Sequence, residues 1–458
     1  MKAVDSWSFR PYRPLLQTLK LPFICRLAPT ETSVSLEWLG EPDAKILFRK
    51  RGGDEWTSAA AASGEAVLTG LSPDTDYEIC AETSGVRGDI RLVRTGTYPG
   101  TVVNYLHPED PVYGFSGHSL CSPSFVRCPQ GHLLASMDVY ASRAPQNLSL
   151  IFRSDDDGRA WHYVCDLFPC FWGRLFVHRG RLFIIAASTE FGDLMIGESR
   201  DGGSTWGTPT VLLRGGCKRD ADGAHRNPQP VVEYGGRLWF SLEWGHGRYA
   251  SLHGSIPADA DPMDAASWTF AAPMYYDPSW PGAAVGDSSG FLEGCMTVCP
   301  DGRLRNILRY QIGNCTPSYG LAVVAAVDTE NPEAPQRFER MMSFPGNHSK
   351  FMIKRVPESG TYLSIVSRIT GPGHENDRNL LSLVASEDLV GWRLVCDLLD
   401  ERESDPKKVG FQYVDFFFEG NDLLWLCRTA INGAYNFHDA NCQTFHRLEG
   451  FRELLKKS

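Results

Sequence analysis

The sequence predicts an all-β protein in which a small β-sandwich, residues 1–98, precedes a six-bladed β-propeller, residues 99–458. Three observations lead to this prediction. Short alternating strand-like runs fill the first part, one tight-turn pattern occurs twice at the spacing of a propeller blade, and six similar strand pairs follow one another to the C-terminus. Helical periodicity is nearly absent, and only the tail after Glu449 predicts a turn of helix.

The first predicted domain contains alternating runs such as 33–38 and 45–49, separated by turn residues. Residues 71–79, Leu-Ser-Pro-Asp-Thr-Asp-Tyr-Glu-Ile, resemble the signature of fibronectin type III modules, in which a Leu and a Tyr pin the loop before a core strand. The resemblance implies a module that braces or spaces its neighbour, and we expect no chemistry in it. The connection at 98–100 is too short for free swinging, which predicts a fixed interface.

Residues 199–206 read Ser-Arg-Asp-Gly-Gly-Ser-Thr-Trp, in which the Asp and Gly close a hairpin and the Trp fills the space beneath it. A second copy, Ser154 to Trp161, begins 45 residues earlier, which is about one four-stranded blade. A less complete copy spans Ser386 to Trp392, and a weaker partial match ends in Trp268. This pattern resembles the Asp box of sialidase-type propellers, and the resemblance implies that fold.

Six strand pairs support the blade count. Each has a small turn residue followed by an apolar strand, and we interpret it as the middle hairpin of a blade. The pairs are centred on residues 131–134, 180–183, 236–239, 301–304, 360–363 and 421–424.

The sialidase resemblance implies four site residues. Glu293 opens a strand, an Asp-Gly hairpin follows, and Arg309 ends the next strand, as in that family. Arg378 lies at the start of the predicted strand that precedes the less complete copy of the Asp box, Ser386 to Trp392. Tyr413 resembles the nucleophilic tyrosine before the final hairpin, with Glu293 as its base, because a free tyrosine attacks poorly at neutral pH. Arg309 and Arg378 would bind a carboxylate through planar, charge-assisted hydrogen bonds.

Two features of the family pattern are missing. Residues 121–124, Cys-Ser-Pro-Ser, stand where the first carboxylate-binding Arg belongs, and residues 144–147, Ala-Pro-Gln-Asn, stand where the acid/base Asp belongs. The candidate substitutes are Asp138 or His118 for the acid and Arg143 for the lost positive charge.

Polar clusters at strand entries indicate a site rebuilt with histidine and amide groups. His118, His225, His348 and His438 each lie in such a cluster, where a histidine can act as acid, base or donor at neutral pH. We expect His225, His348 and His438 to contact the substrate.

These residues predict an exo-acting glycoside hydrolase that removes a terminal acidic sugar from an oligosaccharide. Two alternatives stay open. One is a propeller lyase that uses His or Tyr to eliminate across a uronic acid, and the other is a non-catalytic carbohydrate-binding propeller or a hydrolase of neutral sugars, similar to arabinan-cleaving enzymes.

Composition limits the partners. The formal net charge of −10 argues against nucleic acid and anionic membranes as partners, and no apolar stretch reaches the length of a membrane helix. The N-terminus lacks a signal-peptide core, so we expect a cytoplasmic protein. The 13 cysteines include no Cys-x-x-Cys pair, which favours buried reduced thiols over a disulfide framework or zinc site. We expect neither a metal nor a cofactor.

Overall fold

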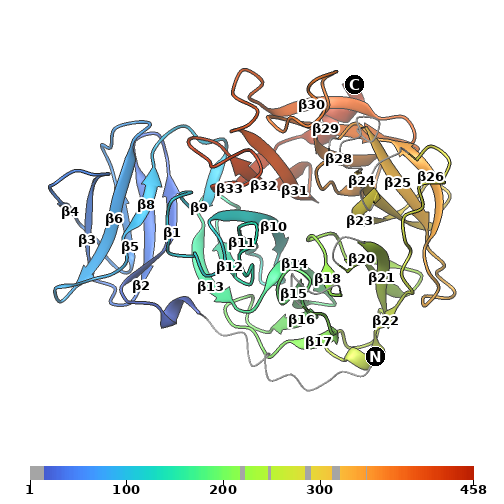
Figure 1. Ribbon diagram of the computed structural model, residues 1–458, viewed down its shortest axis with the longest axis horizontal. Coiled ribbons are helices and arrows are strands. Elements are labelled where there is room, and N and C mark those ends of the chain that lie inside the picture. The colour runs from blue at the N-terminus through green and yellow to red at the C-terminus, as the bar shows by residue number, and fades with distance from the viewer. Residues whose placement is uncertain are drawn as a thin grey trace.

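The computed structural model describes residues 15–216, 222–245, 249–283, 290–311, 320–346 and 348–457. Strands dominate the described chain, and the all-β prediction is confirmed (Figure 1). The expected C-terminal helical turn is present as α1 (Phe451–Lys457). No helix in the described ranges is long and apolar enough to cross a membrane.

The N-terminal part contains two antiparallel sheets after the short helix η1 (Leu16–Thr18). One sheet consists of β1 (Phe23–Pro29), β2 (Val34–Leu39) and β5 (Glu65–Leu68). The other consists of β3 (Lys45–Lys50), β4 (Thr57–Ala59), β6 (Asp76–Thr83), β7 (Val86–Arg87) and β8 (Arg91–Arg94). Alternating apolar residues of both sheets, among them Leu36, Ile46 and Ile79, enter one core. The Tyr77 hydroxyl accepts a hydrogen bond from the Ser72 amide at 2.8 Å, which fixes the loop before β6.

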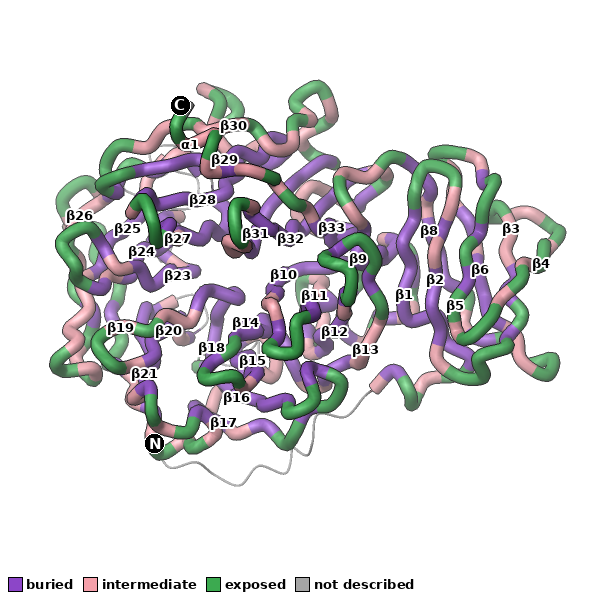
Figure 2. The backbone as a smooth tube through the Cα atoms, turned by 180° about the vertical axis from the view of Figure 1, so that it is seen from behind, coloured by how far each residue is buried: buried purple, intermediate pink, exposed green. Residues whose placement is uncertain are grey.

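Six further sheets stand around a common centre in the described chain, as in a β-propeller (Figures 1 and 2). The first two consist of β10 (Ser119–Arg127), β11 (Leu133–Tyr140), β12 (Ser149–Ser154) and β13 (His162–Leu167), and of β14 (Phe171–His178), β15 (Arg181–Ala187), β16 (Leu194–Ser199) and β17 (Thr210–Leu213). The third consists of β18 (Ala224–His225), β19 (Val232–Tyr234), β20 (Arg237–Trp244), β21 (Ala250–Pro257) and β22 (Thr269–Phe270), with η2 (Ala265–Ser267) before β22.

The last three sheets continue the ring. They consist of β23 (Gly290–Val298), β24 (Leu304–Gln311), β25 (Leu321–Ala326) and β26 (Arg337–Ser343), of β27 (Ile353–Arg355), β28 (Tyr362–Ser367), β29 (Leu380–Ser386) and β30 (Arg393–Asp400), and of β31 (Gly410–Glu419), β32 (Asp422–Ala430), β33 (Cys442–Leu448) and β9 (Thr101–Tyr105). In the sixth sheet β9 pairs with β33, so the strand that follows the two N-terminal sheets completes the sheet formed by the C-terminal strands. This pairing joins the beginning of the ring to its end.

The six predicted glycine- or asparagine-containing turns join the first strand to the second in five of these sheets and β19 to β20 in the third. The predicted position of these turns, in the middle hairpin of each sheet, is therefore wrong. The turns that contain Asp and Trp instead join the third strand to the fourth, as between β12 and β13 and between β16 and β17.

The two Ser-x-Asp-x-Gly turns have the same hydrogen bonds. Gly158 N and Gly203 N each donate to the serine hydroxyl of their own turn at 2.8 Å. A Cβ on Gly158 would lie 2.0 Å from the Phe445 ring of the sixth sheet, and one on Gly203 would lie 2.4 Å from Leu134 of the first sheet. Each turn therefore packs against the preceding sheet of the ring, and only glycine allows this approach.

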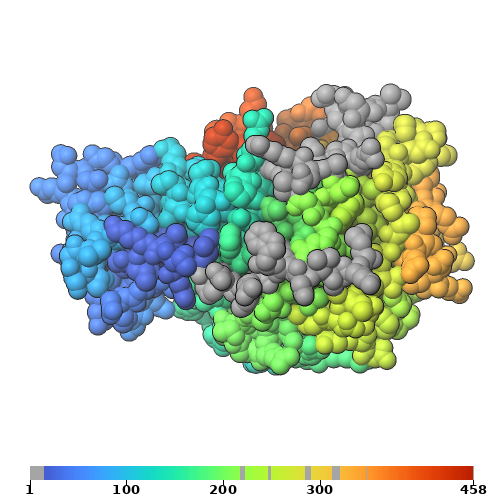
Figure 3. All heavy atoms as spheres, turned by 60° about the horizontal axis from the view of Figure 1, so that its bottom comes forward, coloured from blue at the N-terminus to red at the C-terminus, as the bar shows by residue number. Residues whose placement is uncertain are grey.

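The two N-terminal sheets form a lobe at one end of the molecule and contact the rest of the chain along β1 and β9 (Figure 3). Arg26 Nε donates to the Val103 carbonyl at 2.9 Å. Arg91 and Asp110 form an ion pair of 2.6 Å with side chains that are 1% and 0% exposed. These contacts fix the two parts relative to each other.

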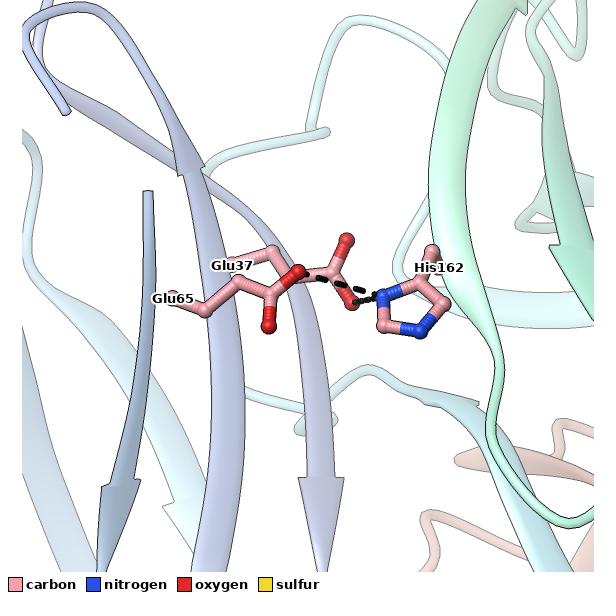
Figure 4. A group of neighbouring side chains, drawn as sticks. All are labelled: Glu37, Glu65 and His162. Carbon is pink, nitrogen blue, oxygen red and sulfur yellow. Dashed lines mark ion pairs between the residues drawn. The ribbon is translucent and has the colours of Figure 1, made fainter. Parts of the chain in front are cut away.

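A second link joins Glu37 of β2 and Glu65 of β5 to His162 of β13 (Figure 4). His162 Nδ1 lies 3.3 Å from a carboxylate oxygen of each glutamate. Arg26 already pairs with Glu37 at 3.0 Å. We therefore interpret the group as an ion-pair network between the two parts of the protein rather than a cation site.

The described cysteines are free thiols, and most of them are buried. Burial raises the pKa of several, for example Cys128 and Cys427, to about 12. This agrees with the expectation of inert, reduced core residues.

Candidate functional site

Four first strands share one irregularity at the centre of the ring. The four strands are β10, β14, β23 and β31. In each of them two consecutive residues lie opposite a single residue of the next strand, which is a β-bulge. The first bulged residue has a positive φ in each case: Ser122 (53°), Trp172 (55°), Glu293 (55°) and Tyr413 (58°). Non-glycine residues rarely adopt this conformation, and they concentrate at functional sites.

The bulges of the fourth and sixth sheets bring Glu293 and Tyr413 together. The Tyr413 hydroxyl donates a hydrogen bond of 2.9 Å to Glu293 Oε1, across 120 residues of sequence. Arg309 Nη1 donates to Glu293 Oε2 at 2.7 Å and to the Tyr413 oxygen at 3.1 Å. The three side chains are 2–7% exposed. The structure thus unites the three residues that the sequence pattern had associated.

Burial and the neighbouring charges set the protonation states of this triad. Burial alone would raise the pKa of Glu293, but the charge and hydrogen bond of Arg309 hold it below its ordinary value. Burial, and then the charge of Glu293, raise the pKa of Tyr413. At neutral pH Glu293 is therefore an ionised acceptor, and Tyr413 is a protonated donor that already points toward it.

Two further buried arginines lie around Tyr413. Arg378 Nη2 donates to the His348 carbonyl at 2.6 Å, and its Nη1 donates to Gln412. The Arg428 guanidinium lies 5.1 Å from the centre of the Tyr413 ring. Arg309, Arg378 and Arg428 all oppose the rise in the pKa of Tyr413, so three positive charges act on its hydroxyl.

In the described chain Arg378 and Arg428 form hydrogen bonds only with neutral groups. Neither guanidinium forms an ion pair with a carboxylate in the described part of the chain. The Nε atoms of Arg309, Arg378 and Arg428 are buried without a hydrogen-bond partner there. Burial lowers the pKa of Arg378 to about 10, which reflects the cost of a buried cation without an adjacent anion.

Two amide side chains from the segment between β18 and β19 support Glu293. Asn227 donates a short hydrogen bond to Glu293 Oε1, and Gln229 donates to the Glu293 carbonyl at 2.8 Å. His225 lies 3.2 Å from Glu243 and packs edge-on against Trp172, with ring centres 4.4 Å apart. Sequence reasoning had singled out His225, but the direct support of Glu293 comes from the two amides beside it.

The other two histidines expected to bind substrate have different surroundings. His348 is 8% exposed, and its carbonyl accepts the hydrogen bond from Arg378. His438 Nδ1 lies 2.8 Å from Asp439, and its carbonyl accepts from Arg428. Burial and the nearby Arg428 lower the pKa of His438 to about 4, so it is neutral at pH 7.

The substitutes expected for the missing family residues lie elsewhere. Asp138 of β11 is 1% exposed, and it accepts hydrogen bonds from Ser149 and from the Trp172 amide at 2.8 Å. Its carboxylate therefore buttresses the bulge of the second sheet. His118 and Arg143 are exposed, and in the described chain neither forms a hydrogen bond or ion pair with Tyr413 or Glu293.

Sequence reasoning missed Arg428 and the role of Asn227. A spacing in the sequence could have indicated Arg428, because Arg309 follows Glu293 by 16 residues and Arg428 follows Tyr413 by 15. Asn227 gives no such signal, since its contact with Glu293 depends on how neighbouring sheets pack.

Neither protein-family models nor curated proteins match the sequence. Solved structures do resemble the fold. The α-L-arabinanase of Penicillium chrysogenum complexed with arabinobiose has a TM-score of 0.53 at 15% identity, covering 78% of this chain and 99% of that one. The α-L-arabinofuranosidase of Fusarium graminearum complexed with arabinobiose has a TM-score of 0.51 at 11% identity, covering 76% and 98%.

A third structure extends over nearly the whole chain. The NanB sialidase of Streptococcus pneumoniae, in complex with 2-[(3-chlorobenzyl)ammonio]ethanesulfonate, has a TM-score of 0.51 at 10% identity, covering 96% of this chain and 98% of that one. At these identities the three matches show a sialidase-like β-propeller fold, and function has to be argued from the site.

Proposed function

We propose that this protein is an exo-acting glycoside hydrolase that cleaves a terminal acidic sugar from an oligosaccharide. Tyr413 is the nucleophile, Glu293 is its base, and Arg309 and Arg378 bind the anionic group of the sugar. The observation that carries the proposal is the hydrogen bond from the Tyr413 hydroxyl to the Glu293 carboxylate within a group of buried arginines.

The arginines distinguish an acidic from a neutral sugar. Arg378 is a buried cation that hydrogen-bonds only to a carbonyl and an amide oxygen in the described chain. A substrate carboxylate would supply the missing charge partner, whereas a neutral sugar such as arabinose would leave the guanidinium uncompensated. This favours an acidic substrate over those of the arabinan-cleaving enzymes with a similar fold.

A tyrosine suits an anomeric centre that carries a neighbouring negative charge, because a carboxylate nucleophile would be repelled there. In the proposed reaction Tyr413 Oη bonds to the anomeric carbon while its proton passes to Glu293. The glycosidic bond breaks, and solvent protonates the departing oxygen. Water then attacks the anomeric carbon and loses a proton to solvent, the bond from that carbon to Tyr413 Oη breaks, and Tyr413 takes its proton back from Glu293.

We further propose that each of the six sheets around the centre is one propeller blade. The two N-terminal sheets would be a fibronectin type III-like spacer, because their contacts with the propeller are structural ion pairs and backbone hydrogen bonds.

Product analysis tests the proposed function. Wild type, Tyr413→Phe and the exposed control Tyr435→Phe would be incubated with sialosides, glucuronides, other ulosonic acid glycosides, rhamnosides and arabinosides, and the products weighed by mass spectrometry. We expect water-added products from an acidic glycoside and a loss on the order of 10³-fold or more in Tyr413→Phe alone. Cleavage of arabinosides only, or full activity of Tyr413→Phe, would refute the proposal, and unsaturated products would identify a lyase.

A further inference from the structure

The second strands of the fourth and sixth sheets carry arginines at corresponding positions. Arg309 of β24 pairs with Leu292, the residue just before the bulge at Glu293. Arg428 of β32 pairs with Gln412, the residue just before the bulge at Tyr413. The same geometry thus places one guanidinium beside each of the two bulged residues.

The corresponding positions of the first two sheets carry no cation. Asp138 of β11 pairs with Cys121 just before the bulge at Ser122, and Ala187 of β15 pairs with Phe171 just before the bulge at Trp172. The sequence lacks an arginine at residues 121–124, and the neighbouring second strand does not replace it.

Arg428 has the surroundings of an anion-binding arginine. It is 3% exposed, and its guanidinium carbon lies 5.1 Å from the centre of the Tyr413 ring and 5.5 Å from that of Tyr140. The hydrogen bond from Arg428 Nη2 to the His438 carbonyl fixes one end of the guanidinium group. Its Nε is buried without a hydrogen-bond partner in the described chain, and no carboxylate pairs with its guanidinium there.

Asp439 fixes this arrangement through His438. The His438 ring lies 2.8 Å from the Asp439 carboxylate and 3.3 Å from Arg428 Nη2 by way of the same Nδ1 atom. When Nδ1 carries the ring proton it donates to the Asp439 carboxylate and holds the ring, while the backbone carbonyl of the same residue accepts from Arg428 Nη2. The Asp439 charge is also close enough for Arg428 to contribute to the lowering of the Asp439 pKa.

We propose that Arg428 is the third arginine that binds the anionic group of the substrate, and that Asp439 is its positioning residue through His438. The inference rests on the proposed function for the substrate class. It adds that the anion is held from the fourth, fifth and sixth sheets, by Arg309, Arg378 and Arg428, without a cation from the first sheet.

The test compares each acid with its methyl ester. Binding of N-acetylneuraminic acid, glucuronic acid and galacturonic acid, and of their methyl esters, would be measured by calorimetry with wild type, Arg428→Gln and the surface control Arg447→Gln. We expect Arg428→Gln to weaken binding of the acid about 10- to 100-fold and binding of the ester less than about 3-fold. Arg447→Gln should match wild type.

A double-mutant cycle tests the positioning role. Asp439→Asn should weaken acid binding about 3- to 10-fold in the wild-type background and leave it unchanged in the Arg428→Gln background. Equal weakening in both backgrounds would show that Asp439 does not act through Arg428.

The outcomes separate the two proposals. If acids bind wild type and Arg428→Gln equally well, or if acid and ester weaken together, the assignment of Arg428 is wrong while the proposed function stands. If no acid binds wild type, the acidic-sugar function fails and the role of Arg428 fails with it. Circular dichroism and the thermal midpoint confirm that each variant is folded.

Discussion

The buried carboxyl group of Asp138 predicts how the stability of the protein depends on pH. Its carboxylate is buried in β11, and burial raises its pKa from 3.8 to about 7 despite the hydrogen bonds from Ser149 and the Trp172 amide. The folded protein therefore holds this proton more tightly than the unfolded chain does. Stability from this group is complete below about pH 4 and is lost as the pH rises through about 7.

The magnitude follows from the shift. A change from 3.8 to about 7 corresponds to about 4 kcal/mol of folding free energy, as an upper value, because local relaxation and water entry reduce it. Asp138→Asn removes the titration and keeps both contacts, since the amide oxygen accepts from the Trp172 amide and the amide nitrogen donates to Ser149. We therefore compare the difference in unfolding free energy, wild type minus variant, at two pH values. This difference should be about 2–4 kcal/mol smaller at pH 8 than at pH 4.5.

Urea unfolding of both proteins at several pH values measures this difference, in which the titration of all other groups cancels. Parallel pH curves would refute the reasoning. The variant should also retain wild-type activity at pH 7, because Asp138 contacts neither Tyr413 nor Glu293 in the described chain. A large loss of activity without a change in the pH dependence of stability would return Asp138 to the role of catalytic acid.

Two other predictions concern the centre of the ring. Glu293→Gln should lower kcat about 10²- to 10⁴-fold in steady-state assays, because the amide cannot take the Tyr413 proton. The exposed control Glu403→Gln should leave kcat unchanged. Near-normal turnover of Glu293→Gln would exclude Glu293 as the base. Arg174→Met should destabilise the protein by about 3–5 kcal/mol in denaturant unfolding, because it removes the 2.5 Å ion-pair partner of the buried Asp415; a loss below about 1 kcal/mol would show that the pair contributes little.

The bulge geometry explains why part of the site was predictable. Glu293 and Arg309 lie on adjacent strands of one hairpin, so their spacing in sequence already implies contact. Tyr413 is predicted through the resemblance of its strand and the following hairpin to the sialidase strand that carries a nucleophilic tyrosine. Its contact with Glu293 was a hypothesis from family resemblance, and the ring of sheets brings the two residues together across 120 positions.

The remaining site residues could not be predicted for a physical reason. Asp138 and Arg428 occupy corresponding positions on second strands, but one side chain turns to a backbone amide of the next sheet and the other to Tyr413. The orientation of each side chain depends on whether the neighbouring sheet presents an unpaired N–H donor or the face of an aromatic ring to it. His118 and Arg143 had suitable chemistry but lie exposed outside this arrangement.

The sequence by itself determined the all-β architecture and the repeated turns, because strand alternation and the Ser-x-Asp-x-Gly hydrogen bonds are local properties of a few adjacent residues. Only the tertiary structure decided which side chains share the centre. The closure of the ring through β9 and β33 and the bulges in the first strands set that convergence, and both arise from packing between sheets that are distant in sequence.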